Sequence, residues 1–252
     1  MKYGIRLVIP KVLPPLDENF RPAVLANHHF RLAADTHATP LVIAIERDHG
    51  EVSRFATNIL PHDHPDAWMN AYYIERIIKF LLWQRGGFRI YIGGSIDIGN
   101  YISQVYSHDG RSRFDHQFMS RQVYEKPFEV ISCPIDEVPE ARESGKLIGR
   151  HLDGCRIGFD LGASDRKVSA VQNGQVVFSE EIIWEPRKKT DPLYHDREIR
   201  TMLNTAAAHL PRVDAIGGSS AGIYIENRPM VASLFRNIAE ENFPRVRDLF
   251  IN

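Results

Sequence analysis

The sequence predicts an α/β protein, because segments with the period of strands alternate with segments with the period of helices. Residues 68–83 place Ile74, Ile78 and Leu81 on one face of a helix. Residues 157–181 indicate a strand, a small-residue turn, a second strand, an Asn-Gly turn and a third strand. Asn-Gly between alternating apolar residues is typical of a tight hairpin.

The composition is that of an ordinary globular protein, with 252 residues, 43% of them hydrophobic and 25% charged. A net charge of −1 gives no indication of a basic surface that would bind nucleic acid or an anionic membrane. No apolar run has the length of a membrane span. The N-terminus lacks a signal-peptide pattern, and the two cysteines have no close pairing. We therefore expect a cytoplasmic protein with no nucleic-acid or membrane partner.

The first half of the chain is expected to form an N-terminal α/β region over residues 1–150. Its elements are an extended proline-punctuated arm, a short helix, a hairpin, a long helix stopped by Gly86-Gly87, and a strand. These elements are predicted at residues 10–22, 20–34, 41–57, 68–83 and 88–92. A linker is predicted over residues 134–153, which carry two prolines and a polar run.

The second half, residues 151–252, repeats the order hairpin, helix, strand. Its elements are predicted at residues 167–181, 195–210 and 213–216. In each half the last strand leads into Gly-Gly-Ser, 52 positions after Leu41 and 50 positions after Lys167. Two interpretations stay open. In the first, both halves descend from one repeated lobe, and the first half has lost the counterpart of the strand at 157–161. In the second, the order recurs only because such strand–helix–strand units are common in α/β proteins.

The strand at 157–161 and the turn after it form a candidate phosphate grip. Gly162, Ala163 and Ser164 are small enough to let backbone N–H groups approach phosphate oxygens. Asp160, at the strand end, could hold a hydrated metal ion. Lys167, on the next strand, is a further candidate phosphate contact. The alternative for Asp160 is that its carboxylate only satisfies turn amides.

The pattern Asp160-x-Gly162-Ala163-Ser164, its hairpin, and the later stretch 215–222 resemble the start of sugar kinases of the ROK (repressor, open reading frame, kinase) family. This resemblance implies a partial ribonuclease H-like or actin-like ATPase lobe within the actin, hexokinase and Hsp70 superfamily. It implies ATP and Mg²⁺ at Asp160, Gly162, Ala163 and Ser164. It also implies a sugar pocket near the residues Gly218, Ser219, Ser220, Ala221 and Gly222.

The chain also departs from the family pattern. The usual phosphate loop has two glycines and a threonine, so Ala163 requires a negative φ. The family's catalytic aspartate and zinc-binding cysteine motif are not recognisable here. The resemblance therefore predicts no catalytic residue, no zinc site and no sugar-dependent ATP turnover by this chain alone. A lobe without its partner elements should expose Leu234, Phe235, Leu249 and Phe250, which predicts a homo-oligomer.

Two alternatives compete with the kinase interpretation, and one further segment is a separate candidate site. One is a non-catalytic module that senses a sugar or nucleotide, or assembles, on the same fold. A second is a hydrolase, because residues 218–222 fit the Gly-x-Ser-x-Gly elbow, although all 11 histidines lie at or before His209. The separate candidate is a metal site at residues 61–65, where two histidines flank Asp63. For that segment a solvated loop, with Asp66 capping the following helix, is preferred.

Overall fold

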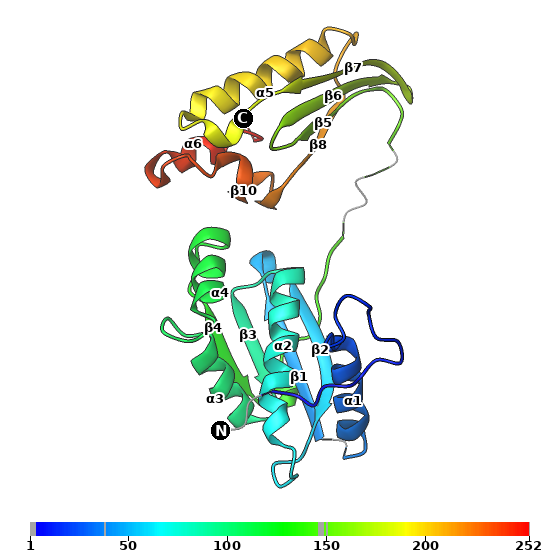
Figure 1. Cartoon of the computed structure of the whole chain (residues 1–252). Helices are drawn as coiled ribbons and strands as arrows, with labels where there is room; N and C mark the ends of the chain where they lie inside the picture. Colours follow the sequence, from blue (N-terminus) through cyan, green and yellow to red (C-terminus); the bar gives the residue numbers. More distant parts are fainter. Residues whose placement is uncertain (1–3, 38, 146–148, 150, 252) are drawn as a thin grey trace. The chain divides into compact units, whose positions relative to one another are not determined.

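A computed structural model describes residues 4–37, 39–145, 149 and 151–251 of the chain. It is a mixed α/β structure, as the sequence predicts, and divides into two compact units at residues 1–145 and 146–252. Each unit is built around its own four-stranded sheet (Figure 1). None of the helices among these described residues is both long and apolar enough to cross a membrane.

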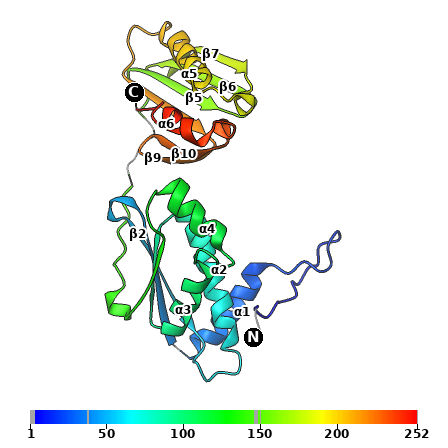
Figure 2. The same ribbon diagram turned by 90° about the vertical axis from the view of Figure 1, so that its left-hand side faces the viewer.

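In unit 1 the sheet order is β2-β1-β3-β4, with β1 antiparallel to both β2 and β3 and with β4 parallel to β3. Helices α1, α2 and α3 lie together on one side of this sheet (Figure 2). In chain order the elements are α1 (Ala23–Asp35), β1 (Thr39–Glu46), β2 (Val52–Ile59), α2 (Trp68–Arg85), β3 (Arg89–Gly93), α3 (Ile96–Val105), α4 (Arg113–Gln117) and β4 (Glu129–Cys133).

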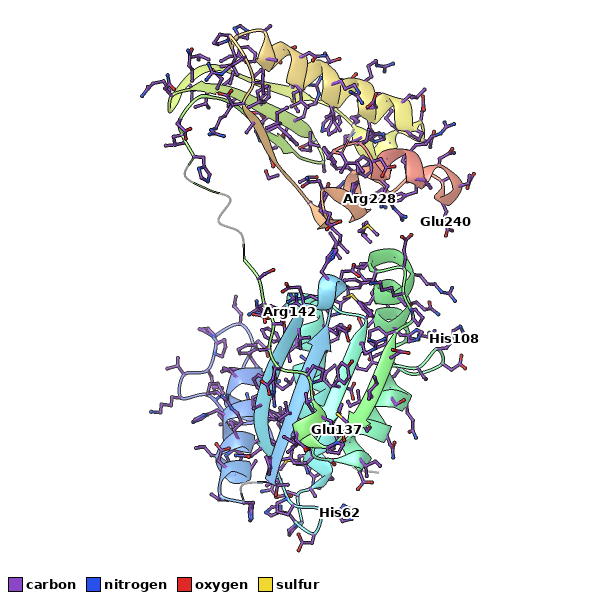
Figure 3. All side chains as sticks on the ribbon, turned by 180° about the vertical axis from the view of Figure 1, so that it is seen from behind. His62, His108, Glu137, Arg142, Arg228 and Glu240 are labelled. Carbon is purple, nitrogen blue, oxygen red and sulfur yellow. The ribbon has the colours of Figure 1, made fainter. Side chains whose placement is uncertain are left out.

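The two faces of this sheet carry separate apolar cores. Ile43 and Ile45 of β1 are fully buried on the helix side, as are Ile74 and Ile78 of α2. On the other side, Val42, Ala44 and Val52 pack with Val138, which follows the last strand. Figure 3 shows this second face, which is crossed by the segment running from Glu137 to Arg142. The chain after β4 therefore belongs to unit 1 as far as Ser144, and the predicted linker begins too early.

Unit 2 has the sheet order β7-β6-β5-β8, in which β5 is antiparallel to β6 and parallel to β8. Helix α5 packs on one face, where Arg166 of β6 is buried and its guanidinium lies 2.8 Å from the carboxylate of Glu198. In chain order the elements are β5 (Cys155–Leu161), β6 (Asp165–Gln172), β7 (Gln175–Ile183), α5 (Pro192–Ala207), β8 (Ala215–Ser220), β9 (Gly222–Ile225), β10 (Arg228–Ala232) and α6 (Phe243–Arg247).

The predicted Asn-Gly hairpin is confirmed. Asn173 and Gly174 connect β6 and β7 with φ of 50° and 82°. Positive φ at both central residues is typical of the type I′ turn, whose twist matches that of the flanking strands.

The prediction that the last strand of unit 2 ends before a Gly-Gly-Ser turn is wrong. Gly217, Gly218 and Ser219 lie inside β8 instead of forming a turn after it.

The recurrence seen in the sequence corresponds to a shared arrangement with one difference. In unit 1, the strand after the long helix, β3, pairs directly with β1 of the hairpin. In unit 2, the corresponding strand β8 is separated from β6 by β5. Because β8 is parallel to β5, it still runs antiparallel to β6, as β3 runs to β1. The sheet of unit 2 thus has the order of β2, β1 and β3 with β5 inserted before the last of them, and β8 stands at its edge where unit 1 continues with β4.

The expectation of uncovered apolar residues near the C-terminus is wrong for two of the four. Leu234 and Phe235 are each 1% exposed and belong to the core of unit 2. Leu249 and Phe250 are partly buried against the same core. The short segments after β8 supply this cover, since α6 packs with α5 and β10, and Ala232 of β10 and Tyr224 of β9 join the same core. The exposed surface that suggested a homo-oligomer is therefore smaller than expected.

Gly86 ends α2 with a φ of 77°, and a Cβ built there would lie 2.2 Å from the hydroxyl oxygen of Tyr124. Burial raises the pKa of that phenol to about 12. We expect Gly86→Ala to destabilise unit 1 by about 2 kcal/mol or more, from left-handed strain and overpacking. Urea unfolding followed by circular dichroism measures this. Gly145→Ala is the matched control, since its Cβ meets no atom within 4 Å. Equal losses in both variants would contradict the prediction.

Candidate functional site

A row of polar side chains crosses the face of the unit 2 sheet opposite α5. Asp160 of β5 is the register partner of Lys167 on β6 and of Ser219 on β8. Because directly paired residues point to the same side of a sheet, the three side chains share one face. Glu181 of β7 continues the row as the partner of Lys167. The structure therefore brings together Asp160, Lys167 and Ser219 of the predicted site.

Lys167 is surrounded by carboxylates. Its ammonium nitrogen lies 2.9 Å from Asp165 Oδ1 and 3.8 Å from Glu181 Oε1, and Asp160 adds a further favourable charge. The hydrogen bond with Asp165 is the main reason why the pKa of Lys167 is raised. The same bond is the main reason why the pKa of Asp165 is lowered. Asp160 in turn accepts a hydrogen bond from the Ser219 hydroxyl.

The turn at residues 162–164 is fixed by hydrogen bonds to its neighbours. Gly162 N–H donates to Asp165 O at 2.9 Å. The indole N–H of Trp184 donates to Gly162 O at 2.9 Å, and the Trp184 backbone N–H donates to Ser164 O at 3.0 Å. Trp184 is 4% exposed. Sequence reasoning missed this residue, because a tryptophan directly after a strand carries no signal of which turn it supports.

Two backbone donors of the turn are available to a ligand. Ala163 lies outside the set of residues with positive φ, so the methyl group at this position causes no left-handed strain. Within the part of the chain that the structure describes, the N–H groups of Ala163 and Ser164 donate to no protein acceptor. The Ser164 hydroxyl donates to Asp165 Oδ2 at 3.0 Å. Backbone N–H groups without a protein acceptor, at a partly exposed turn, can donate to an anion.

Beside the polar row, two glycines leave the sheet surface open. Gly158 and Gly217 are register partners on β5 and β8, and a Cβ at either would meet no atom within 4 Å. Together with Asp160, Lys167 and Ser219 they line a shallow depression of about 410 Å³. Along the chain, Asp160 lies between Gly158, which lines the depression, and the turn that follows β5.

The segment predicted as the sugar-side turn is divided between the two faces of the sheet. Ser219 points to the face of the polar row, whereas Gly218 and Ser220 point to the α5 side. There they line a second cavity of about 610 Å³, together with Phe159 and Tyr224. Burial raises the pKa of the Tyr224 phenol. The glycine is required at 218 because a Cβ would lie 2.1 Å from the Phe159 ring.

Ala221 forms the bend between β8 and β9, and Gly222 is the first residue of β9. Gly222 has a φ of 154°, and a Cβ there would lie 2.4 Å from the carbonyl oxygen of Val231. The chain then continues as a strand instead of opening a helix. A nucleophile elbow needs a helix after the serine, so the structure excludes the hydrolase interpretation of residues 218–222.

The histidine loop at residues 61–65 does not form a metal centre. His62 is 95% exposed at its side chain and lies 3.7 Å from Asp97, while the ring of His64 packs against that of His37. Across the described residues, no group of three or more histidine, cysteine or acidic side chains is placed to hold a metal. The predicted capping role of Asp66 is wrong, because its carboxylate instead accepts hydrogen bonds from Arg6 and the Trp68 indole.

The chain was compared with known protein families and with curated proteins. No family model and no curated protein matches the sequence.

The first test of the site concerns the charge of Lys167. We expect Lys167→Met to raise the pKa of Asp165 towards its ordinary value, because the variant removes the main hydrogen bond that lowers it. Carboxyl-detected NMR titration of the full chain measures the change. In the unchanged chain, Asp165 favours folding above its unfolded-state pKa, and this contribution is lost as the pH falls through the folded-state value. An unchanged pKa in the variant would show that Lys167 does not hold Asp165.

The second test uses two adjacent glycines of β8. We expect Gly218→Ala to destabilise unit 2 by about 1–3 kcal/mol, because the new methyl group collides with Phe159. Gly217→Ala points to the open face, where its methyl group meets nothing. It should therefore leave the free energy of unfolding nearly unchanged. Chemical denaturation of both variants measures the difference, and a larger loss for Gly217→Ala would show that the faces are assigned the wrong way round.

Proposed function

We propose that residues 151–252 form the phosphate-binding part of a ROK-like sugar kinase, on a ribonuclease H-like or actin-like ATPase lobe. The observation that supports this is the parallel pairing of β5 with β8, which aligns Asp160 with Ser219 and Leu161 with Ser220. It puts the turn at 162–164 and the bend at Ala221 at the same edge of the sheet. Ligands of open α/β sheets bind at the carboxyl ends of such strands.

In this proposal the turn binds the phosphates of ATP. The N–H groups of Ala163 and Ser164 are the donors, and the open surface over Gly158 and Gly217 leaves room for the ligand. Asp160 would hold Mg²⁺, which proteins usually bind through one or two carboxylates together with substrate phosphates. The Ser219 hydroxyl, which donates a hydrogen bond to Asp160, would supply a second oxygen beside that carboxylate. When bound, Mg²⁺ neutralises charge on the phosphates.

The cavity of about 610 Å³ next to Gly218 and Ser220 is the proposed place for the sugar. Its walls combine aromatic rings, from Phe159 and Tyr224, with the polar side chain of Asn227. Binding sites for small molecules commonly combine an apolar lining with a few polar groups that fix orientation. No side chain of this chain is assigned as the base that would accept the sugar's hydroxyl proton.

The second candidate is a non-catalytic module that senses a nucleotide or sugar. Lys167 favours it, because Asp165 holds the ammonium at 2.9 Å and so competes with phosphate for that charge. Both candidates require phosphate binding at the turn, but only the kinase requires transfer.

Binding is tested by titrating the full chain with ADP in a calorimeter, with and without Mg²⁺. We expect binding that requires Mg²⁺, and a dissociation constant about tenfold higher in Asp160→Asn because the metal loses its carboxylate. Asp136→Asn, an exposed aspartate of unit 1, is the matched control. Equal affinity in Asp160→Asn and the unchanged chain would refute the proposed role of Asp160. Transfer is tested separately by a coupled assay with hexoses, in which the chain should release no ADP above background. Turnover that appears in the unchanged chain and is lost in Asp160→Ala would contradict this expectation. It would show that the site contains a base that is not assigned here.

A further inference from the structure

The outer edge of β2 in unit 1 is occupied by the chain itself. Residues 139–144, called here the edge segment, run antiparallel to the start of β2. Val52 N–H donates to Arg142 O at 2.8 Å, and Arg142 N–H donates to Val52 O at 2.9 Å. Arg142 is labelled at this edge in Figure 3. A sheet edge bears unpaired backbone groups that readily accept another strand, so covering it prevents unwanted pairing.

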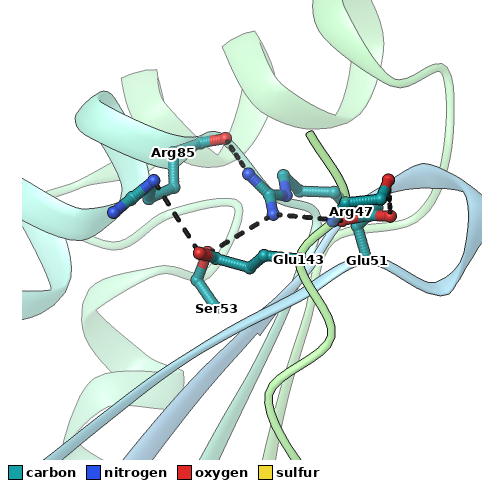
Figure 4. A network of polar contacts seen from close by, with 6 residues as sticks. Arg47, Glu51, Ser53, Arg85 and Glu143 are labelled. Atoms are coloured by element: carbon teal, nitrogen blue, oxygen red, sulfur yellow. Dashed lines mark hydrogen bonds and ion pairs between the residues drawn. The ribbon is translucent and has the colours of Figure 1, made fainter. Parts of the chain in front are cut away.

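The side chains of the edge segment add charge pairing to this backbone bridge. Glu140 forms an ion pair with Arg54, the residue opposite it in the antiparallel register. Glu143 accepts a hydrogen bond from Ser53 and lies 3.7 Å from the guanidinium of Arg47 and 3.9 Å from that of Arg85 (Figure 4). Each acidic side chain of the segment thus meets at least one arginine of unit 1.

The last residue of the segment is held in a different way. Glu51 accepts hydrogen bonds from the Ser144 hydroxyl at 2.6 Å and from its backbone N–H at 2.9 Å. The hydrogen bond from the Ser144 hydroxyl is the main reason why the pKa of Glu51 is lowered. The segment therefore combines one backbone bridge with several polar contacts that water and salt can replace.

A groove of about 420 Å³ lies between the edge segment, β2, α1 and α2. Phe55, Ile77 and Leu81 supply apolar lining, while Arg31, Arg54 and Arg85 supply three positive charges. Two of these arginines are paired with glutamates of the edge segment. Arg31 is exposed and has no ion-pair partner within the described residues. The groove is therefore more positive than the edge segment alone can balance.

We propose that the β2 edge and this groove form a binding surface for an acidic, extended peptide segment, and that the edge segment is its built-in occupant. Strand addition supplies the backbone hydrogen bonds, as in other sheet edges that bind peptides. The arginines select glutamate or aspartate side chains at the positions of Glu140 and Glu143. The spare charge of Arg31 favours a partner more acidic than the edge segment itself.

The edge segment has a large advantage over a separate peptide, because it belongs to the same chain. Its effective concentration at the β2 edge is on the order of millimolar, so a peptide in solution competes poorly. Weakening the edge segment should therefore reveal the surface. Glu140→Gln/Glu143→Gln removes both negative charges while preserving the shape of the side chains. The arginines of the groove are then left for an external ligand.

The test is fluorescence anisotropy of a labelled peptide spanning residues 137–145, titrated with the full chain. The double variant should bind this peptide about tenfold more tightly than the unchanged chain. A peptide with lysine at the positions of Glu140 and Glu143 should bind neither the double variant nor the unchanged chain. The matched control is Glu240→Gln/Glu241→Gln, which alters two exposed glutamates of unit 2 and should behave as the unchanged chain.

Adding Arg54→Glu to the double variant should abolish the gain, because it reverses a charge that the ligand needs. If the double variant does not fold, Arg142→Pro serves the same test by removing the N–H group that donates to Val52. A folded variant with no gain in peptide affinity overturns the proposal. Equal binding of the acidic and lysine-substituted peptides overturns it as well.

Discussion

The parallel pairing of β5 and β8 is the constraint on which the candidate site depends. It brings residues 59 positions apart in the chain, Asp160 and Ser219, into direct register, and their side chains form a hydrogen bond. The same pairing puts Gly158 beside Gly217 and so keeps the neighbouring surface clear. Helix α5 makes this pairing possible, because a connection between parallel strands must cross the sheet.

Most regular elements could be predicted from the sequence, because their signals are local. The stripe on α2 has the period of a helix, and Asn173-Gly174 specifies its turn by backbone geometry alone. The segment 217–219 was misplaced because glycine is as compatible with an edge strand as with a turn. Its real requirement is the Phe159 ring that lies over Gly218, a contact between distant residues that no local pattern reports.

The candidate site shows the same limit. Asp160 and the turn after it were found by their types and spacing, but the residues that hold the turn were not. Trp184 binds two carbonyl groups near the turn, and Asp165 pairs with Lys167. The Trp184 contact depends on the register between β6 and β7, which sets Asp165 opposite Ile183, the residue before Trp184. The Asp165 contact joins two residues of β6 that point to the same face. The edge segment of unit 1 resembles a linker in its polar composition, and its ordering depends on arginines of other elements.

The charges around Lys167 determine what the site can bind. Asp160, Asp165 and Glu181 surround a single ammonium group, which leaves an excess of two negative charges. Such a surface repels a free phosphate, and the amides of Ala163 and Ser164 carry only partial charge. Under the proposed function, a divalent cation would balance the excess and supply the attraction that these side chains lack. The Mg²⁺ dependence expected under the proposed function therefore has a second argument, from the charge of this surface, besides the resemblance to a family.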